Sequence, residues 1–114
     1  MAGKKDKVKD KDRQTIITKD FTGRCFLCGS NDRVAKHEAF GGPYRAKSKE
    51  FGMVYELCGA HHNLSSNGVH FNKELDLKLK QHAEKIWLKH YTDNNLSMEE
   101  RINMFIKTFG KNYL

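Results

Sequence analysis

The sequence has no apolar run of membrane-spanning length and no hydrophobic segment typical of a signal peptide. We therefore expect a cytoplasmic protein without a membrane partner. Hydrophobic residues make up 38% of the 114 residues and charged residues 31%, so the core must be modest. That size suits one small domain, for which a bound metal ion would add folding free energy.

Cysteine is scarce, with three residues in the chain. Three thiols cannot all pair within one chain, and a reducing cytosol favours thiolate ligands over disulfides. The spacing Cys25-x-x-Cys28 followed by Cys58-x-x-His61 supplies the four ligands of a tetrahedral structural Zn²⁺ site. The adjacent His62 is an alternative fourth ligand, but the CxxH spacing mirrors the CxxC and favours His61. The competing interpretation is that these cysteines are small buried apolar residues.

The formal net charge of +7 is concentrated in two regions. Residues 1–13 hold six Lys or Arg against three Asp, and residues 36–49 hold four Lys or Arg against one Glu. We expect residues 1–19 to form a flexible basic arm and residues 20–114 to form a single domain. The charge favours a polyanionic partner, most simply nucleic acid, and the alternative is a solvated basic surface.

The remaining segments predict an α+β fold. Short strands are expected near residues 33–38 and 53–57, and Gly-Gly-Pro predicts a basic loop over residues 41–50 between them. Apolar residues at helical spacing predict a long helix capped by Asn72 and ending near Thr92.

A second helix is expected farther along the chain. It would begin at Ser97, with Glu100 completing a capping box, and Gly110 would stop it.

Three histidines, His37, His62 and His70, lie near the cysteine motifs without a role in the zinc set. Hydrolysis of a phosphodiester needs a base, which neutral imidazole supplies near pH 7, and a cation to offset developing negative charge. The competing interpretation is that they are ordinary histidines, as expected for His82 and His90 on the long helix. Their clustering favours a reaction centre.

At this point the sequence resembles a known family, the HNH or His-Me finger endonucleases. More narrowly, it is similar to small phage-encoded members and to the phage recombination-enhancement nucleases that depend on the RecA recombinase. The resemblance covers about residues 25–90. The motifs that carry it are Cys25-x-x-Cys28, Lys36-His37-Glu38-Ala39-Phe40-Gly41-Gly42, Leu57-Cys58-x-x-His61-His62 and Gly68-Val69-His70-x-Asn72.

The resemblance implies a zinc-stapled ββα-metal domain, here with two additional C-terminal helices. It implies a metal-dependent endonuclease that nicks or cleaves DNA, in phage recombination or DNA processing within the cytoplasm of a bacterial host. The cofactors would be structural Zn²⁺ and a catalytic Mg²⁺, Mn²⁺ or other divalent cation. DNA would be the substrate, and a recombinase or another phage replication or recombination protein a further partner.

The same resemblance assigns roles to residues. His37 matches the general base, and His62 and His70 match the ligands of the catalytic metal. We expect the basic loop to position the DNA backbone through Arg45, Lys47 and Lys49 without reading sequence.

The chain departs from the family pattern at Lys36. Many relatives place a metal-binding Asp or His there, and a protonated lysine cannot serve. Glu38 is a candidate substitute, but in a regular strand it would point away from His37. The alternative function is a non-catalytic zinc module that binds DNA or a protein partner.

Overall fold

Two short antiparallel strands form the sheet. Strand β1 (Ala35–Glu38) pairs with β2 (Val54–Leu57) in a register that sets His37 opposite Tyr55. Every residue of β2 is buried, whereas β1 buries His37 alone. Both expected strands are present, and each is shorter than the sequence pattern indicates. The more apolar strand is therefore the more buried one, and Lys36 is the exposed residue of β1.

The computed structural model describes residues 15–18, 20–65 and 68–114. Most of the expected basic arm, residues 1–14, lies outside these ranges. Thr15 is buried, and its hydroxyl donates a hydrogen bond of 2.6 Å to the carbonyl of Val54. The amide of Ile16 donates to the carbonyl of Gly52 at 3.0 Å. Residues 15–18, which the sequence assigned to the arm, thus lie against the domain.

The segment between the strands is helical, so the expected loop over residues 41–50 is wrong. A 3-10 turn, η2 (Gly42–Tyr44), leads into helix α1 (Arg45–Glu50). Pro43 stands at the start of the turn, where its fixed φ favours helix entry. The buried Ser48 accepts a hydrogen bond from the amide of Phe40 at 3.0 Å and donates to its carbonyl at 2.8 Å. These bonds fix α1 against the end of β1.

Two further helices follow β2. Helix α2 (Gly59–His62) is a single turn, and α3 (Lys73–Tyr91) is the longest element. The side chain of Asn72 caps α3 by accepting a hydrogen bond of 3.1 Å from the amide of Leu75. The expected cap is therefore confirmed, as is the end of the helix before Thr92.

The last helix, α4 (Met98–Phe109), also begins and ends as expected. Ser97 and Glu100 form a reciprocal capping box. Gly110 ends the helix with a φ of 84°, a left-handed conformation that glycine adopts without strain. No helix in the described ranges combines the length and apolar character needed to span a bilayer.

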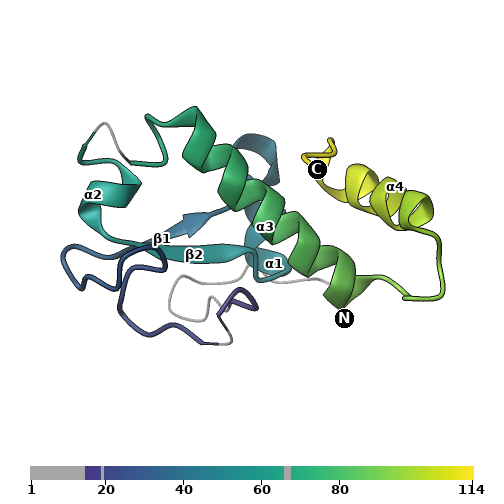
Figure 1. Ribbon diagram of the computed structural model, residues 1–114, viewed down its shortest axis with the longest axis horizontal. Coiled ribbons are helices and arrows are strands. Elements are labelled where there is room, and N and C mark those ends of the chain that lie inside the picture. Colours follow the sequence, from purple (N-terminus) through teal and green to yellow (C-terminus); the bar gives the residue numbers. More distant parts are fainter. Residues whose placement is uncertain (1–14, 19, 66–67) are drawn as a thin grey trace.

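Helix α3 runs across the sheet, with α2 at one end of the strands and α4 beyond the other (Figure 1). Aromatic rings join these elements. Phe40, just after β1, stacks 4.5 Å from Phe109, which lies 4.9 Å from Phe105, and Phe105 lies 5.4 Å from Trp87 of α3. The fold is a small α+β unit whose core anchors the C-terminal end of β1.

Removing one ring of this core tests its role. We expect Phe105→Ala to lower the free energy of unfolding by about 3–5 kcal/mol, because Phe105 is fully buried and its loss leaves a cavity. Met104→Ala, at an exposed neighbouring position, should change it by less than about 0.5 kcal/mol. Urea denaturation of the two variants measures this, and equal effects would contradict the assigned core.

Candidate metal centres

Four side chains meet beyond one end of the sheet and form the cysteine cluster, defined as Cys25, Cys28, Cys58 and His61. Their donor atoms all lie within 4.8 Å of one another. The Cys28 and Cys58 sulfurs are 3.7 Å apart, and His61 Nδ1 lies 3.6 Å from Cys25 Sγ and 3.3 Å from Cys58 Sγ. A tetrahedral Zn²⁺ with ordinary bond lengths would set such atoms about 3.5–3.8 Å apart. The geometry is compatible with a zinc site, as the motif spacing predicted.

The backbone around Cys25 explains why this cluster forms. The amide of Cys25 donates to the carbonyl of Ser30, and the amide of Gly29 donates back to the carbonyl of Cys25, both at 2.8 Å. Gly29 has a φ of 79°, which the tight turn requires. The amide of Phe26 donates to the carbonyl of Glu56 at 2.7 Å. The turn is thereby joined to β2 just before Cys58.

The electrostatics of the thiols favour a bound cation. Burial raises the pKa of Cys25, but hydrogen bonds from backbone groups and from His61 outweigh it and lower the pKa to about 6. A backbone hydrogen bond at Ser30 lowers the pKa of Cys28, yet desolvation and the nearby thiols of Cys58 and Cys25 raise it overall. Thiolates packed this closely repel one another, and a divalent ion between them removes that cost.

Helix α2 directs its two adjacent histidines to different places. Successive residues of a helix are rotated by about 100° around its axis. His61 therefore turns toward the cysteine cluster, whereas His62 turns toward His37 and His70. The sequence favoured His61 over His62 as the fourth zinc ligand, and the structure groups His61 with the three cysteines.

His37 of β1, His62 of α2 and His70, in the segment before α3, make up the histidine cluster. Their donor atoms also lie within 4.8 Å of one another. The ring centroid of His37 lies 5.4 Å from that of His62 and 5.3 Å from that of His70, and the Nε2 atoms of His62 and His70 are 3.0 Å apart. Two nitrogens bound at right angles to one ion would be about 3.0 Å apart.

Backbone contacts hold His70 over α2. The amide of Val69 donates to the carbonyl of His61 at 2.7 Å, and the amide of His70 donates to the carbonyl of His62 at 3.2 Å. A Cβ at Gly68 would lie only 2.8 Å from the carbonyl oxygen of His62. Only glycine permits this close approach, so Gly68 is a positioning residue for His70.

Burial favours the neutral form of two histidines of this cluster, His37 and His62. His37 is 8% exposed, and its Nε2 is buried without a hydrogen-bond partner among the described residues. Desolvation, with smaller contributions from His62, His70 and Lys80, lowers its pKa to about 3. Desolvation and His70 also lower the pKa of His62. Neutral imidazoles carry lone pairs, so the cluster suits a divalent cation or a transferable proton.

The histidine cluster lines a pocket of about 520 Å³, called here the histidine pocket. Arg45 also lines it, and the Arg45 Nε lies 3.4 Å from Glu38 Oε1. Glu38 therefore lines the same pocket as His37, although alternation along a regular strand predicts that the two side chains point to opposite faces. Glu38 is the last residue of β1, where the regular strand ends. Lys47 and Lys49 also lie on α1, but they do not line this pocket.

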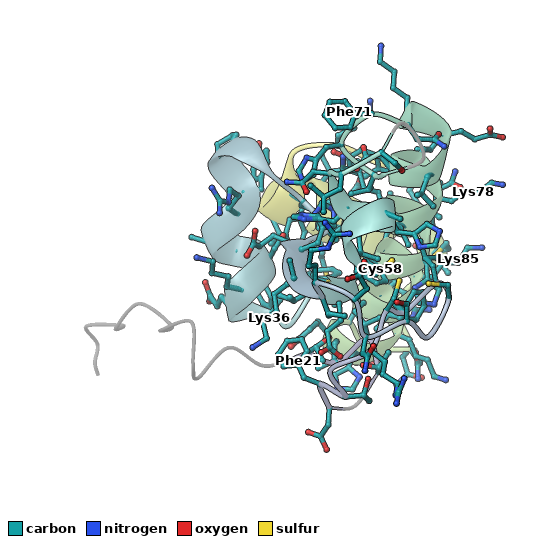
Figure 2. The ribbon with its side chains drawn as sticks, turned by 90° about the vertical axis from the view of Figure 1, so that its left-hand side faces the viewer. Phe21, Lys36, Cys58, Phe71, Lys78 and Lys85 are labelled. Carbon is teal, nitrogen blue, oxygen red and sulfur yellow. The ribbon has the colours of Figure 1, made fainter. Side chains whose placement is uncertain are left out.

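Lys36 also lines the histidine pocket, and an aromatic ring holds its ammonium. The Lys36 ammonium lies over the ring of Phe21, 4.5 Å from its centroid, and the two side chains are neighbours in Figure 2. The structure adds an ion pair between Lys80 and Asp76 of α3 to the lining. The sequence analysis missed this pair, although its i,i+4 spacing on a helix was a readable signal.

Zinc content tests the cysteine cluster. We expect elemental analysis by inductively coupled plasma mass spectrometry to find about one Zn²⁺ per chain. Cys58→Ala should lose both the zinc and the cooperative thermal unfolding transition. A structural zinc supplies folding free energy on the order of 10 kcal/mol. His90→Ala, which removes an exposed histidine of α3, should retain both. A Cys58→Ala protein with unchanged zinc and melting temperature would contradict the assignment.

No family model, curated protein or solved structure was found to match this chain. The residues of the two clusters and of the histidine pocket therefore carry what is inferred about function.

Proposed function

We propose that the chain is a metal-dependent endonuclease of the HNH type that hydrolyses DNA phosphodiester bonds. The observation that carries the proposal is the convergence of His37, His62 and His70 in one pocket that also holds cationic side chains. His37 is well separated in sequence from the other two, and the three come from a strand, a helix and a connecting segment. Core packing does not require three imidazoles to meet at a solvent-accessible pocket, whereas a base and the ligands of a cation are what phosphodiester hydrolysis uses.

The order of the elements adds support. A β1–β2 pair followed by a helix carries the histidines in the sequence order that the His-Me finger resemblance implies, with the cysteine cluster beside it. A structural Zn²⁺ at that cluster would fix α2, and so the position of His62. The zinc-stapled ββα-metal fold belongs to this proposal.

His37 is the proposed general base. It sits on the rigid strand, and the contacts around Phe40 and Ser48 fix the end of that strand. Its low pKa keeps the imidazole neutral before substrate binds. A phosphate entering the pocket brings negative charge, which raises the pKa of His37 toward the operating pH. The imidazole can then take a proton from the attacking water.

His62 and His70 are the proposed ligands of a catalytic Mg²⁺, Mn²⁺ or comparable ion. When bound, such an ion offsets the charge that develops on the phosphate and on the leaving oxygen. Lys36 offers no ligand, since its ammonium lies over Phe21. Glu38 lines the same pocket and supplies the carboxylate oxygen that the usual residue at position 36 would provide.

DNA is the proposed substrate because the pocket and its surroundings are basic. Arg45 lines the pocket, and Lys47 is exposed on the same helix. Both would contact phosphates and position the duplex without reading its sequence. Action in phage recombination, with a recombinase as partner, is part of the same proposal and rests on the family resemblance.

Plasmid nicking tests the activity and the base together. We expect the protein to convert supercoiled plasmid to the nicked or linear form with Mg²⁺ or Mn²⁺, and to stop when EDTA is added. His37→Ala should reduce the single-turnover rate by about 10²–10⁴-fold, the usual contribution of a general base. The variant should keep the zinc and the melting temperature of the parent protein.

His90→Ala is the matched control, because it removes an exposed histidine distant from the pocket lining. Its rate should equal that of the parent. Full activity of a folded His37→Ala protein would refute the role of His37, and no cleavage with any divalent cation would refute the enzyme.

Metal counting separates the nuclease from a zinc module that only binds DNA or a protein. We expect zinc-loaded protein to bind one further Mn²⁺, seen by electron paramagnetic resonance. His70→Ala should weaken that binding by more than about 10-fold, the cost of losing even an outer partner of a ligand. Zinc content should not change. A protein that binds zinc alone would favour the binding module.

A further inference from the structure

Lys80 occupies an unusual place for a lysine of α3. It lines the histidine pocket, and its side chain is 19% exposed. Lys78 and Lys85 of the same helix are exposed and point away from the body of the molecule in Figure 2. Burying a lysine costs hydration free energy that an exposed position does not cost. Its place beside three histidines therefore points to a ligand rather than to stability.

Two contacts hold the Lys80 side chain in place. Asp76, one helical turn earlier, forms an ion pair with the ammonium. The ring of Tyr113 lies beside the same ammonium, with its centroid 5.8 Å from Nζ. An ammonium has three N–H donors, so the pair with Asp76 leaves donors for a second acceptor.

Tyr113 is itself fixed by α3 through both of its backbone groups. Its amide donates a hydrogen bond of 2.8 Å to Glu84 Oε1, and its carbonyl accepts one of 2.8 Å from Gln81 Nε2. Glu84 is fully buried. The C-terminal segment is thus held against α3, and its aromatic ring supports the lysine at the pocket.

We propose that Lys80 contacts a DNA phosphate in the histidine pocket, with Tyr113 as its positioning residue and Asp76 as the carboxylate that competes with the phosphate for the ammonium. The inference rests on the proposed function, which it deepens by naming a phosphate contact that sequence reasoning missed. An anion is the ligand that fits the free donors of the ammonium, and Arg45 contributes another positive charge to the same lining. A nucleic-acid phosphate meets both cations without any base-specific contact.

Salt-dependent DNA binding tests the contact without relying on cleavage. The probe is a fluorescent 20-base-pair duplex in Ca²⁺, titrated with the full zinc-loaded chain over a range of KCl concentrations. We expect Lys80→Met, which keeps the aliphatic stem, to weaken binding and to reduce the slope of log affinity against log salt by about 0.9, the value for one phosphate. Lys80→Arg should restore the slope.

Lys85→Met is the matched control, since it removes the same charge from an exposed position of α3. Its slope should equal that of the parent. Asp76→Asn should bind the duplex more tightly than Glu74→Gln, because only Asp76 competes with the phosphate for Lys80. Thermal unfolding of each variant identifies any loss of fold. Lys80→Arg, which conserves the charge, and Asp76→Asn, which conserves the side-chain shape, keep the test valid if Lys80→Met is unstable.

Equal slopes for Lys80→Met and Lys85→Met would overturn the inference, as would a parent protein that does not bind the duplex. A parent that binds with the expected Lys80 dependence but never nicks DNA would support the phosphate contact and refute the nuclease. With active protein, we also expect Lys80→Met to lower the single-turnover nicking rate at saturating DNA by about tenfold or more, and Lys85→Met to leave it unchanged.

Discussion

The convergence of four side chains in the cysteine cluster is the constraint on which the rest of this small structure depends. It joins the turn before β1, the end of β2 and helix α2. The buried core away from this cluster combines aromatic and aliphatic side chains. A four-residue helix such as α2 has too few hydrogen bonds to persist alone, and its place beside the cluster and the backbone bonds from Val69 and His70 hold it. A Zn²⁺ bound at the cluster would add folding free energy at this point.

The histidine pocket is assembled from the edges of that stapled unit. Each histidine is presented by a different kind of support: His37 by a strand, His62 by a helix and His70 by a segment hydrogen-bonded across the helix. Support of this kind limits ring movement without filling the pocket. Cationic side chains from α1 and α3 complete the wall, and each is paired with a carboxylate that reduces the repulsion between them. The pocket therefore holds charge of both signs around the three imidazoles.

Local signals in the sequence predicted much of this arrangement. Helix caps depend on a few neighbouring residues, which is why Asn72 and Ser97 were found at the expected starts of α3 and α4. The CxxC and CxxH spacings are likewise local, and they predicted which four side chains converge in the cysteine cluster. The prediction of a loop over residues 41–50 was wrong because Gly-Gly-Pro was interpreted as a break in regular structure, whereas the proline begins a helical turn. The ion pair of Lys80 with Asp76 had a local signal in its i,i+4 spacing, whereas the contact of Lys80 with Tyr113, more than thirty residues later in sequence, has none.

The division of α2 between two clusters has a consequence for how the protein responds to its surroundings. His61 and His62 are consecutive residues of one rigid turn, so a displacement of one is a displacement of the other. Oxidation of a thiol, or competition for zinc by another chelator, would rotate that turn and remove a wall of the neighbouring pocket. Redox state and zinc supply would thus reach the histidine pocket through a single backbone segment.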